Sequence, residues 1–347
     1  MVSVETVAKK CYIYIMSIIN SKKTLISGVK PTGTPHIGNY FGAMKQFVDM
    51  QNEDVYNVLI FIADLHALTS VKNANEMREN THNLILDYLA IGLDPEKVTL
   101  FRQSDVPAHA ELCWVFNCIT TMPEMMRAHA FKDAEAKNKD INVGMFDYPL
   151  LMAADILLYN TDIVPVGQDQ KQHLEIARDT ARTFNNLYCK NNEPTFIEPA
   201  ELIMPDVATV PGTDGQKMSK SYKNIIPLFG TDAEWEKAVM SIVTDSKTPG
   251  EIKNPDECNI FALHKLVTPP EHLTEIRNRY ITGGIGYKES KDILLESIKN
   301  YFGPMRERRE AFAQNPEAIT QILKTGGAAA LKIATAKMTE VKQKIGL

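Results

Sequence analysis

The sequence contains few cysteines, and none of them are spaced as metal-binding or redox pairs. Its five cysteines are scattered over 347 residues, at positions 11, 113, 118, 189 and 258. The lack of a Cys-x-x-Cys pair argues against zinc and iron–sulfur sites, and the odd total disfavours a disulfide framework. We therefore expect a protein with free thiols that works in a reducing cytoplasm and binds no metal through its own side chains.

Strong net charge is also missing. The chain has 38 Lys and Arg residues against 43 Asp and Glu residues, which gives a formal net charge of -5. A protein that coats nucleic acid without sequence preference must neutralise many phosphates, so this balance argues against that class. Any contact with RNA must be local.

Long apolar runs are missing near the N-terminus as well. The apolar segment Cys11–Asn20 is far shorter than the roughly 20 residues that a membrane-spanning helix needs, so we expect no membrane contact. Lys9 and Lys10 precede it as in a signal peptide, but no small-residue cleavage site follows. We interpret residues 1–21 as an N-terminal extension, with Met16 as an alternative start.

What is present is the composition of an ordinary folded protein, with 44% hydrophobic and 23% charged residues. A chain of this length predicts a large domain and a smaller one. Apolar runs predict strands at Lys23–Ser27, Val55–Ala63, Val98–Arg102 and Ile163–Val166. Amphipathic stretches between them predict helices at Asn39–Met50, Glu76–Leu93, Pro107–Ala134, Pro149–Tyr159 and Asp169–Phe184. This alternation predicts an α/β fold with a Rossmann-like, doubly wound parallel sheet.

The C-terminal third reads as helical throughout. Its predicted helices are Trp235–Ile242, Ile260–Leu266, Tyr287–Tyr301, Met305–Gln314 and Ala328–Ile345. We therefore expect residues 22–229 to form the Rossmann-like catalytic domain, with a helical insertion at about 105–147. Residues 230–347 should form an all-helical domain whose last helix packs back on the catalytic domain. The polar segment Glu135–Val143 is interpreted as a mobile loop.

A glycine- and proline-rich turn follows the first predicted strand and ends in Pro35-His36-Ile37-Gly38-Asn39. Glycines let the backbone approach a ligand, and the start of the next helix offers free N–H groups to an anion. His36 and Asn39 add side-chain donors, and Lys30 can place a positive charge nearby. Considered alone, the motif is explained equally well as a surface turn.

A second loop ends in Lys217-Met218-Ser219-Lys220-Ser221. The glycines before it allow movement, and two lysines with two hydroxyls can close over a pyrophosphate leaving group as its charge builds. For a Lys-x-x-Lys pattern alone, a solvated basic loop is the better explanation.

Taken together, the two motifs, the alternating strands and helices and the helical C-terminal part closely resemble the class I aminoacyl-tRNA synthetases. The family's first motif commonly ends in histidine where this chain has Asn39, and the tryptophan branch is similar in tolerating asparagine. The resemblance implies amino-acid activation by ATP with Mg²⁺ bound through the triphosphate. It also implies catalytic roles for His36, Asn39, Lys217, Lys220 and, near the nucleotide, Lys132.

A third motif points to the amino acid. The predicted helix Tyr148–Tyr159 is apolar on nearly every side except at Asp155, so we expect this carboxylate to point into an apolar pocket. A buried carboxylate needs a partner, and an indole ring has one N–H donor and no acceptor. The alternative is a carboxylate that pairs with an arginine or faces solvent.

This segment resembles the tryptophan-pocket helix of bacterial tryptophanyl-tRNA synthetases, with Asp155 at the indole-binding position and Met152 against the ring. The carboxyl end of a parallel strand, here followed by Gly167, is where α/β sheets bind ligands. By resemblance, the tryptophan-binding residues are Gly28, Tyr148, Met152, Asp155, Val164, Val166 and Gln170. The ATP-binding residues are Lys30, Pro31, Thr32, Gly38, Asn39, Gly167, Gln168, Asp169, Val207, Lys217, Met218, Ser219, Lys220 and Ser221. Many relatives carry an acidic residue at the position of Gln168. His66 matches a family position, and a packed core histidine explains it equally well.

The resemblance runs from about Thr24 onward and implies a tRNA specific for tryptophan as partner, L-tryptophan as substrate and a homodimer. The basic segment Arg306–Arg309 either contacts tRNA phosphates or forms a solvated helix face. Three other functions compete: a tyrosyl-tRNA synthetase, whose phenol both donates and accepts; an RNA-binding paralogue without catalysis; and a small-molecule nucleotidyltransferase.

Overall fold

A computed structural model describes residues 22–127, 142–167, 171–190, 193–203 and 210–347. Within them, five strands form one sheet in the order β3-β2-β1-β4-β5, and all neighbouring pairs are parallel. The strands are β1 Lys23–Val29, β2 Tyr56–Ile62, β3 Val98–Arg102, β4 Ile163–Val166 and β5 Ala200–Ile203. The predicted Rossmann-like α/β class is therefore confirmed. β5 was not predicted.

The strand order places a ligand-binding edge at the centre of the sheet. From β1 the chain builds outward through β2 to β3, then returns to the other side of β1 to add β4 and β5. The order therefore reverses between β1 and β4, and ligands bind beyond the carboxyl ends of strands at such a point. The first motif follows β1, and the Gly167 turn follows β4.

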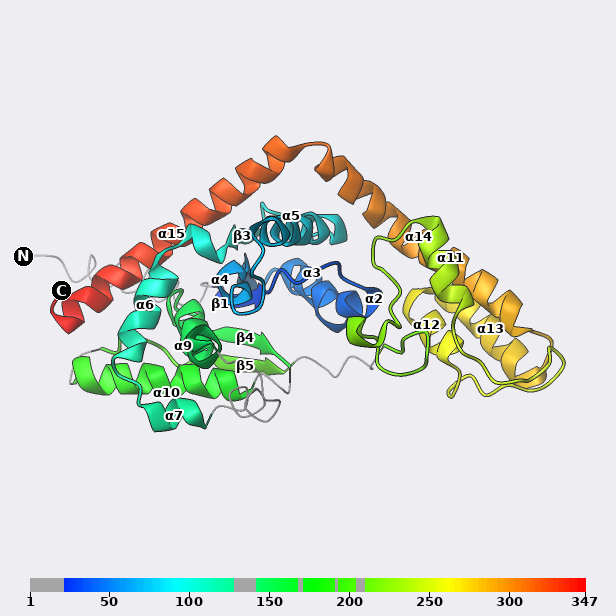
Figure 1. Cartoon of the computed structure of the whole chain (residues 1–347), viewed down its shortest axis with the longest axis horizontal. Coiled ribbons are helices and arrows are strands. Elements are labelled where there is room, and N and C mark those ends of the chain that lie inside the picture. Colours follow the sequence, from blue (N-terminus) through cyan, green and yellow to red (C-terminus); the bar gives the residue numbers. More distant parts are fainter. Residues whose placement is uncertain (1–21, 128–141, 168–170, 191–192, 204–209) are drawn as a thin grey trace, which may run out of the picture.

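Both faces of the sheet are buried, as a parallel sheet requires. One face presents Leu25, Ile60 and Leu100 to a core shared with α3 (Lys45–Glu53) and α5 (Ala74–Ile91). The other presents Ile26 and Phe61 to α6 (Ala108–Asn117), α9 (Val143–Leu157) and α10 (Lys171–Tyr188). Figure 1 shows α9 and α10 on one side of the sheet and α3 and α5 on the other.

The remaining elements connect these layers. They are α2 (Ile37–Asn39), a π-helical turn (Tyr40–Met44), α4 (Asp64–Ala67), the 3₁₀ turn η2 (Gln103–Asp105), α7 (Met122–Met126), the 3₁₀ turn η4 (Lys220–Tyr222), α11 (Asp232–Met240), α12 (Asn259–Val267), α13 (Pro270–Thr282), α14 (Tyr287–Ala313) and α15 (Pro316–Ile345). We call residues 232–313 the helical lobe. None of the helices in the described part of the chain is long and apolar enough to cross a membrane.

Two of the errors in the predicted helix bounds lie at prolines, and a third is the last helix, which begins at Pro316 and not at the predicted Ala328. The predicted break at Pro304 is wrong, because α14 runs through it as one helix. Likewise α9 begins at Val143 and contains Pro149, which was taken as a helix start. A proline inside a helix removes one backbone hydrogen bond, and here burial of neighbouring apolar side chains outweighs that loss. The helix predicted from Pro107 ends at Asn117, and most of the predicted loop at 135–143 lies outside the described residues.

The arginines in the basic segment of α14 bind other parts of this chain, and contact of this segment with tRNA stays a prediction. Arg306 donates to the Gly230 carbonyl at 3.0 Å, and its guanidinium lies 4.7 Å from the ring of Trp235. Arg308 donates to the Ala90 carbonyl at 2.9 Å. Arg309 donates to the buried Asp87 of α5 at 2.6 Å. The segment therefore fastens α14 to α5 and to the start of the helical lobe.

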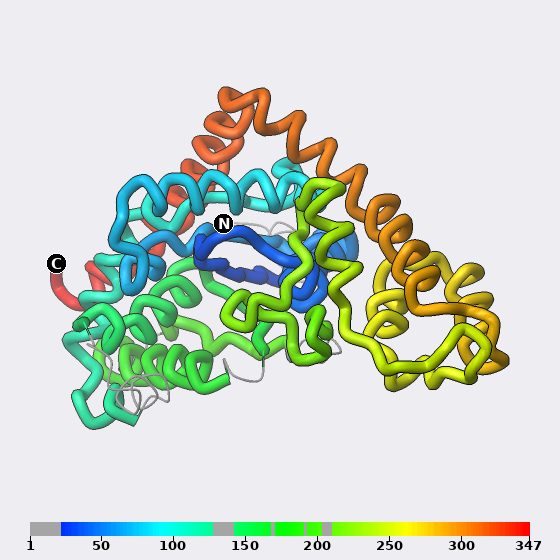
Figure 2. The backbone as a smooth tube through the Cα atoms, turned by 45° about the vertical axis from the view of Figure 1, so that its right-hand side comes forward, coloured from blue at the N-terminus to red at the C-terminus, as the bar shows by residue number. Residues whose placement is uncertain are grey.

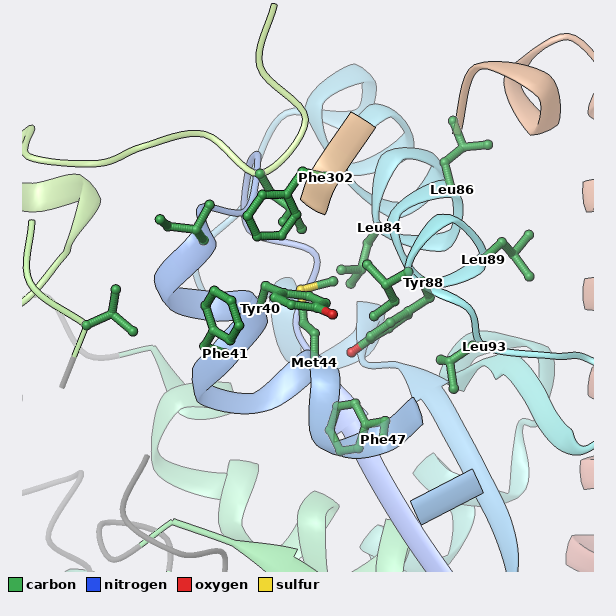
Figure 3. Close-up of a cluster of buried hydrophobic side chains, with 14 of the residues drawn as sticks. Tyr40, Phe41, Met44, Phe47, Leu84, Leu86, Tyr88, Leu89, Leu93 and Phe302 are labelled. Carbon is green, nitrogen blue, oxygen red and sulfur yellow. The ribbon is translucent and has the colours of Figure 1, made fainter. Parts of the chain in front are cut away.

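An aromatic cluster joins the helical lobe to the turn that follows the first motif. Tyr40 and Phe41 come from the π-helical turn and pack edge-on against Phe302 of α14, with ring centroids 5.4 and 6.1 Å away. The Tyr40 and Tyr301 hydroxyls are 3.4 Å apart. Figure 3 shows the rings of Tyr40, Phe41 and Phe302 meeting between the turn, α5 and α14. The first motif and the helical lobe thus share one core.

The last helix, α15, covers the edge of the sheet at β3. Figures 1 and 2 show α14 and α15 forming an arch, with α15 running back beside β3 and α6. Lys342 of α15 pairs with Glu111 of α6 at 2.7 Å. An alanine Cβ at Gly326 would lie 1.9 Å from the Leu100 carbonyl oxygen, so the helix backbone rests directly on edge strand β3.

Replacing Gly326 with alanine tests this contact. The added methyl group must push α15 off the strand, so we expect the free energy of unfolding to fall by about 2 kcal/mol or more, as overpacking does. Gly303→Ala in α14 is the control, because no atom lies within 4 Å of the added Cβ. It should stabilise the protein by about 0.5–1 kcal/mol through helix propensity. Urea denaturation measures both, and equal effects would contradict the close approach.

Candidate active site

The first motif forms a compact cap at the start of α2. The backbone N–H of Asn39 donates to Nδ1 of His36 at 3.3 Å, and the backbone N–H of His36 donates to Oδ1 of Asn39 at 3.1 Å. Because Nδ1 accepts, the proton of a neutral His36 ring lies on Nε2. Two backbone bonds, Ile37 N to Ile226 O and Leu228 N to Pro35 O, hold the motif against residues 226–228.

The second motif lies opposite this cap, and the two enclose a cavity of about 570 Å³. An alanine Cβ at Gly38 would lie 3.3 Å from Cβ of Met218, so glycine allows the two motifs to approach. The size suits a small-molecule ligand. Its lining residues are His36, Gly38, Asn39, Gly42, Ala43, Val210, Lys217, Met218, Ser219, Ser221 and Tyr222.

The electrostatics of the cavity favour an anion. Burial, reinforced by the nearby Lys220, lowers the pKa of His36 to about 4, so its ring is neutral near pH 7 and serves as an N–H donor. Burial also lowers the pKa of Lys220. Lys220 Nζ donates to the Thr32 carbonyl at 2.7 Å, which ties the second motif to the loop of the first. These are polar donors without a carboxylate among the lining residues, a set that matches phosphate oxygens.

Asn224 holds the second motif in place and was not predicted. It is 2% exposed, its Oδ1 accepts from Ser219 N at 2.8 Å, and its Nδ2 donates to the Lys217 carbonyl at 3.1 Å. Nδ2 also donates to Asp214 at 2.6 Å. An alanine Cβ at Gly212 would lie 2.2 Å from this amide. No pattern in the sequence distinguishes Asn224 from a surface asparagine, because only folding brings its partners Ser219, Lys217 and Asp214 around it.

The third motif places Asp155 inside a polar cluster beyond the end of the sheet. The Asp155 side chain is buried, and its oxygens accept from three side chains. His66 Nε2 is 2.8 Å from Oδ2, while His109 Nδ1 and Gln103 Nε2 lie 2.6 and 2.7 Å from Oδ1. The surroundings are thus less apolar than predicted, and neither an arginine nor solvent takes part. Gln103 and His109 were not predicted; a histidine inside the apolar run of α6 was the available signal.

The ionised form of Asp155 is strongly favoured. Burial alone would raise the pKa of this carboxyl, but His109 and His66 outweigh burial and lower it to about 2. His66, for which a family role and a core role were equally supported, is 6% exposed and serves as one of these donors.

Lys30 and Tyr148 meet between the two parts of the site. Lys30 follows β1, and its Nζ lies 5.5 Å from the ring centroid of Tyr148 on α9, within cation–π distance. Burial lowers the Lys30 pKa. The Tyr148 hydroxyl is 2.8 Å from Nε2 of His173. The end of β1 therefore reaches the helix that carries Asp155.

The other predicted residues divide into two groups. Gly28 lies at the end of β1 under the ring of Phe61, where an alanine Cβ would be 2.3 Å from the ring. Val164 and Val166 are buried in β4, Met152 is half-buried on α9, and Gly167 and Pro31 follow β4 and β1. The predicted site residues that lie outside the described residues are Lys132, Gln168, Asp169, Gln170 and Val207.

The arrangement combines an anion site with a buried acceptor. Donors suited to a polyphosphate surround the cavity after β1, and an ionised carboxylate lies on the helix leading into β4. Among the described residues, no group of three or more His, Cys, Asp or Glu side chains could hold a metal ion. The cavity donors and the carboxylate can position charged groups of a ligand.

Comparison with known proteins agrees with this geometry. The family model described as "tRNA synthetases class I (W and Y)" matches residues 20–303. The chain is 49% identical over 325 residues to the tryptophan–tRNA ligase of Fusobacterium nucleatum, covering 94% of this chain and 98% of that protein. The ligase of Rhodopirellula baltica is 44% identical, with coverage of 93% and 99%. A crystal structure of the Campylobacter jejuni tryptophanyl-tRNA synthetase with ADP and tryptophan superposes with a TM-score of 0.88 at 42% identity, covering 93% of this chain and all of that one.

Asn224→Ala tests how the second motif is held. We expect the Kd for ATP to rise about tenfold, because the loop loses its side-chain anchor and leaves backbone groups unpaired. Asn185→Ala is the matched control, since Asn185 clamps another loop by accepting from Thr195 N and Phe196 N at 3.0 and 3.2 Å. It should lower stability but leave the Kd unchanged. Calorimetric titration measures both; unchanged ATP binding in Asn224→Ala would contradict the anchoring role.

Proposed function

The chain belongs to the class I tRNA synthetases of the tryptophan and tyrosine type, and we propose how its described residues divide the work of that family's reaction. It is a tryptophan–tRNA ligase: it activates L-tryptophan with ATP, releases pyrophosphate and transfers tryptophan to the 3′-terminal adenosine of its tRNA. The observation that carries the tryptophan assignment in this chain is the buried, ionised Asp155.

The cavity between the two motifs binds the triphosphate of ATP. His36 donates through Nε2 and Asn39 through its amide, while Lys217 and Lys220 supply positive charge. The tryptophan carboxylate is ionised at pH 7 and needs no general base, so it attacks the α-phosphorus in line. The protein's task is to hold the reactants and to stabilise the charge that builds on the departing pyrophosphate. Gly38, Ser219 and Ser221 line the same cavity and bind the phosphates with them.

Magnesium fits this site only as a complex with the nucleotide. The cavity offers imidazole, amide, ammonium and hydroxyl groups, whereas Mg²⁺ prefers carboxylate and phosphate oxygens. Mg²⁺ bound to the triphosphate would neutralise part of its charge.

Tryptophan binds between the ends of β1 and β4 and helix α9. Asp155 accepts the indole N–H, Met152 packs on the ring, and Val164 and Val166 line the slot. Tyr148 faces the amino group. Asp155 is 1% exposed, so the side chains above it must shift for indole to enter, which suits the adaptable Met152.

The helical lobe contacts the tRNA beyond its acceptor end, and the chain acts as a homodimer. Support for the dimer is an apolar surface around a cavity of about 400 Å³ beside α4, α6 and α9. Trp114 is 70% exposed there and Leu68 is 53% exposed. An exposed tryptophan beside other exposed apolar side chains is typical of an interface between proteins. The cysteines of the described residues, Cys113, Cys118, Cys189 and Cys258, are free thiols, which supports a cytoplasmic location.

ATP–pyrophosphate exchange with each of the twenty amino acids tests the reaction and the pocket together. We expect exchange with tryptophan alone. Asp155→Ala should lower the preference for tryptophan over 3-benzothienylalanine, which carries sulfur in place of the indole N–H, about ten- to hundredfold in kcat/KM, because a hydrogen bond to a charged acceptor is lost. Exchange with tyrosine, or an unchanged preference in the variant, would refute the pocket assignment. No exchange at all would favour a non-catalytic paralogue.

Sedimentation equilibrium tests the dimer. The wild type should have twice the 38.9 kDa mass of the chain, and Trp114→Glu should shift it to the monomer because a charge is buried at the interface. Ile252→Glu is the control, since Ile252 is 64% exposed in the helical lobe, away from this surface. A wild-type monomer, or an Ile252→Glu variant that dissociates equally, would refute the proposed interface.

A further inference from the structure

A series of hydrogen bonds, which we call the relay, connects Asp155 through His109 to Tyr159, beside Phe101 of β3. The Tyr159 hydroxyl is 2.8 Å from Nε2 of His109, and Nδ1 of His109 is 2.6 Å from Oδ1 of Asp155. Gln103 Nε2 reaches the same oxygen at 2.7 Å. Gln103 and His109 are 0% exposed and Tyr159 is 2% exposed, so water does not compete for these bonds.

The direction of each bond in the relay follows from its partners. A carboxylate can only accept, so Nδ1 of His109 carries a proton. Burial raises the Tyr159 pKa, so the hydroxyl stays protonated and donates to Nε2. His109 therefore donates to Asp155 through Nδ1 and accepts from Tyr159 through Nε2.

The geometry of the two donors is equally constrained. The His109 ring is stacked with Phe101 at a centroid distance of 6.3 Å and lies 6.0 Å from Phe61, which prevents it from turning. The Gln103 amide is oriented by its own oxygen, which accepts from the backbone N–H of His66 at 3.4 Å. Its Nε2 must then face Asp155.

These bonds leave Asp155 with one open acceptor position. A carboxylate has about four lone-pair sites. His109 and Gln103 fill both sites on Oδ1, and His66 fills one on Oδ2. We propose that Tyr159, His109 and Gln103 are positioning residues that saturate Oδ1, so that Oδ2 presents a single acceptor to the indole N–H of tryptophan. The proposal rests on the assignment of Asp155 as the indole acceptor.

The relay makes the site more selective for tryptophan than a carboxylate without it would be. A freely rotating carboxylate could also accept from a phenol or a water molecule at several angles. A fixed Oδ2 with one open site serves one donor at one place, and a ligand that lacks the donor leaves that site unpaired. Tyr159 affects the ligand only through His109, so it is a positioning residue and not a catalytic one.

The test uses the full chain and compares kcat/KM for tryptophan with kcat/KM for 3-benzothienylalanine in ATP–pyrophosphate exchange. Tyr159→Phe removes only the hydroxyl that hydrogen-bonds to Nε2 of His109, and we expect the ratio to fall about fivefold, as for a lost neutral hydrogen bond. His109→Leu should lower it about tenfold or more. His109→Gln should recover most of the ratio, because an amide can both donate to Asp155 and accept from Tyr159. The KM for ATP should stay unchanged in all three.

Tyr280→Phe is the matched control. Tyr280 is 0% exposed in the helical lobe, and its hydroxyl is 2.8 Å from Oγ of Ser290, so this change removes a comparable buried bond far from the site. It should leave the ratio unchanged. If Tyr159→Phe lowers kcat/KM equally for tryptophan and the sulfur analogue, its role is structural and the relay is overturned.

The outcome for Asp155→Ala separates the two assignments. A lower ratio in Asp155→Ala with an unchanged ratio in both Tyr159→Phe and His109→Leu would overturn the relay and keep the pocket. An unchanged ratio in Asp155→Ala would overturn the pocket assignment, and the relay with it.

Discussion

The need to neutralise one buried carboxylate brings together helix α9 and the segments that follow β2 and β3. Asp155 lies on α9, just before β4, while its donors come from the segments that follow β2 and β3. An ionised carboxylate in a protein interior is costly unless several donors face it, so these segments must meet at one point. That point lies beyond the carboxyl ends of the strands, where a doubly wound sheet binds its ligands. The buried charge of Asp155 and the strand order therefore both point to this place for the proposed tryptophan pocket.

The position of the phosphate site depends on a second connection, between the first motif and the helical lobe. The π-helical turn directly after Asn39 buries Tyr40 and Phe41 against α14. On the other side, Arg309 of α14 pairs with Asp87 of α5. A change in the angle of the helical lobe would thus act on the π-helical turn and, through it, on the first motif, which contains His36. The basic residues of α14 hold this lobe in place through bonds to other parts of the chain.

The sequence was sufficient for features set by local patterns. Apolar segments predicted β1 to β4, and the two glycine-rich loops predicted the two sides of the cavity, because each signal lies within a few residues. β5 has the sequence AELI, in which Glu201 interrupts the apolar run, and Pro304 and Pro149 misled the helix bounds because tertiary burial outweighs one missing hydrogen bond. His109 and Asn224 could not be assigned because their roles depend on partners that only folding brings together. Asp155 was found by its resemblance, and His66 was noted as a family position, but the donors Gln103 and His109 were not predicted.

Two buried aspartates show why the number of donors decides what a carboxylate can do. Asp155 and Asp87 are each 1% exposed. Asp87 has one strong partner, Arg309, and its Oδ2 has no hydrogen-bond partner among the described residues, so burial dominates and raises its pKa to about 6. Asp155 has three donors, and two of them, His109 and His66, outweigh burial and lower its pKa to about 2.

The signs of the resulting contributions to stability are opposite. The lowered pKa of Asp155 stabilises the fold above about pH 4, and this contribution is lost as the pH falls toward 2. The raised pKa of Asp87 stabilises the fold below about pH 4, and this contribution is lost as the pH rises toward 6. Near pH 7 the ionised Asp87 therefore lowers the free energy of unfolding, while its carboxylate holds Arg309 and the helical lobe. At Asp155 it keeps a stable charge with one open site, which is what recognition of a lone N–H donor requires.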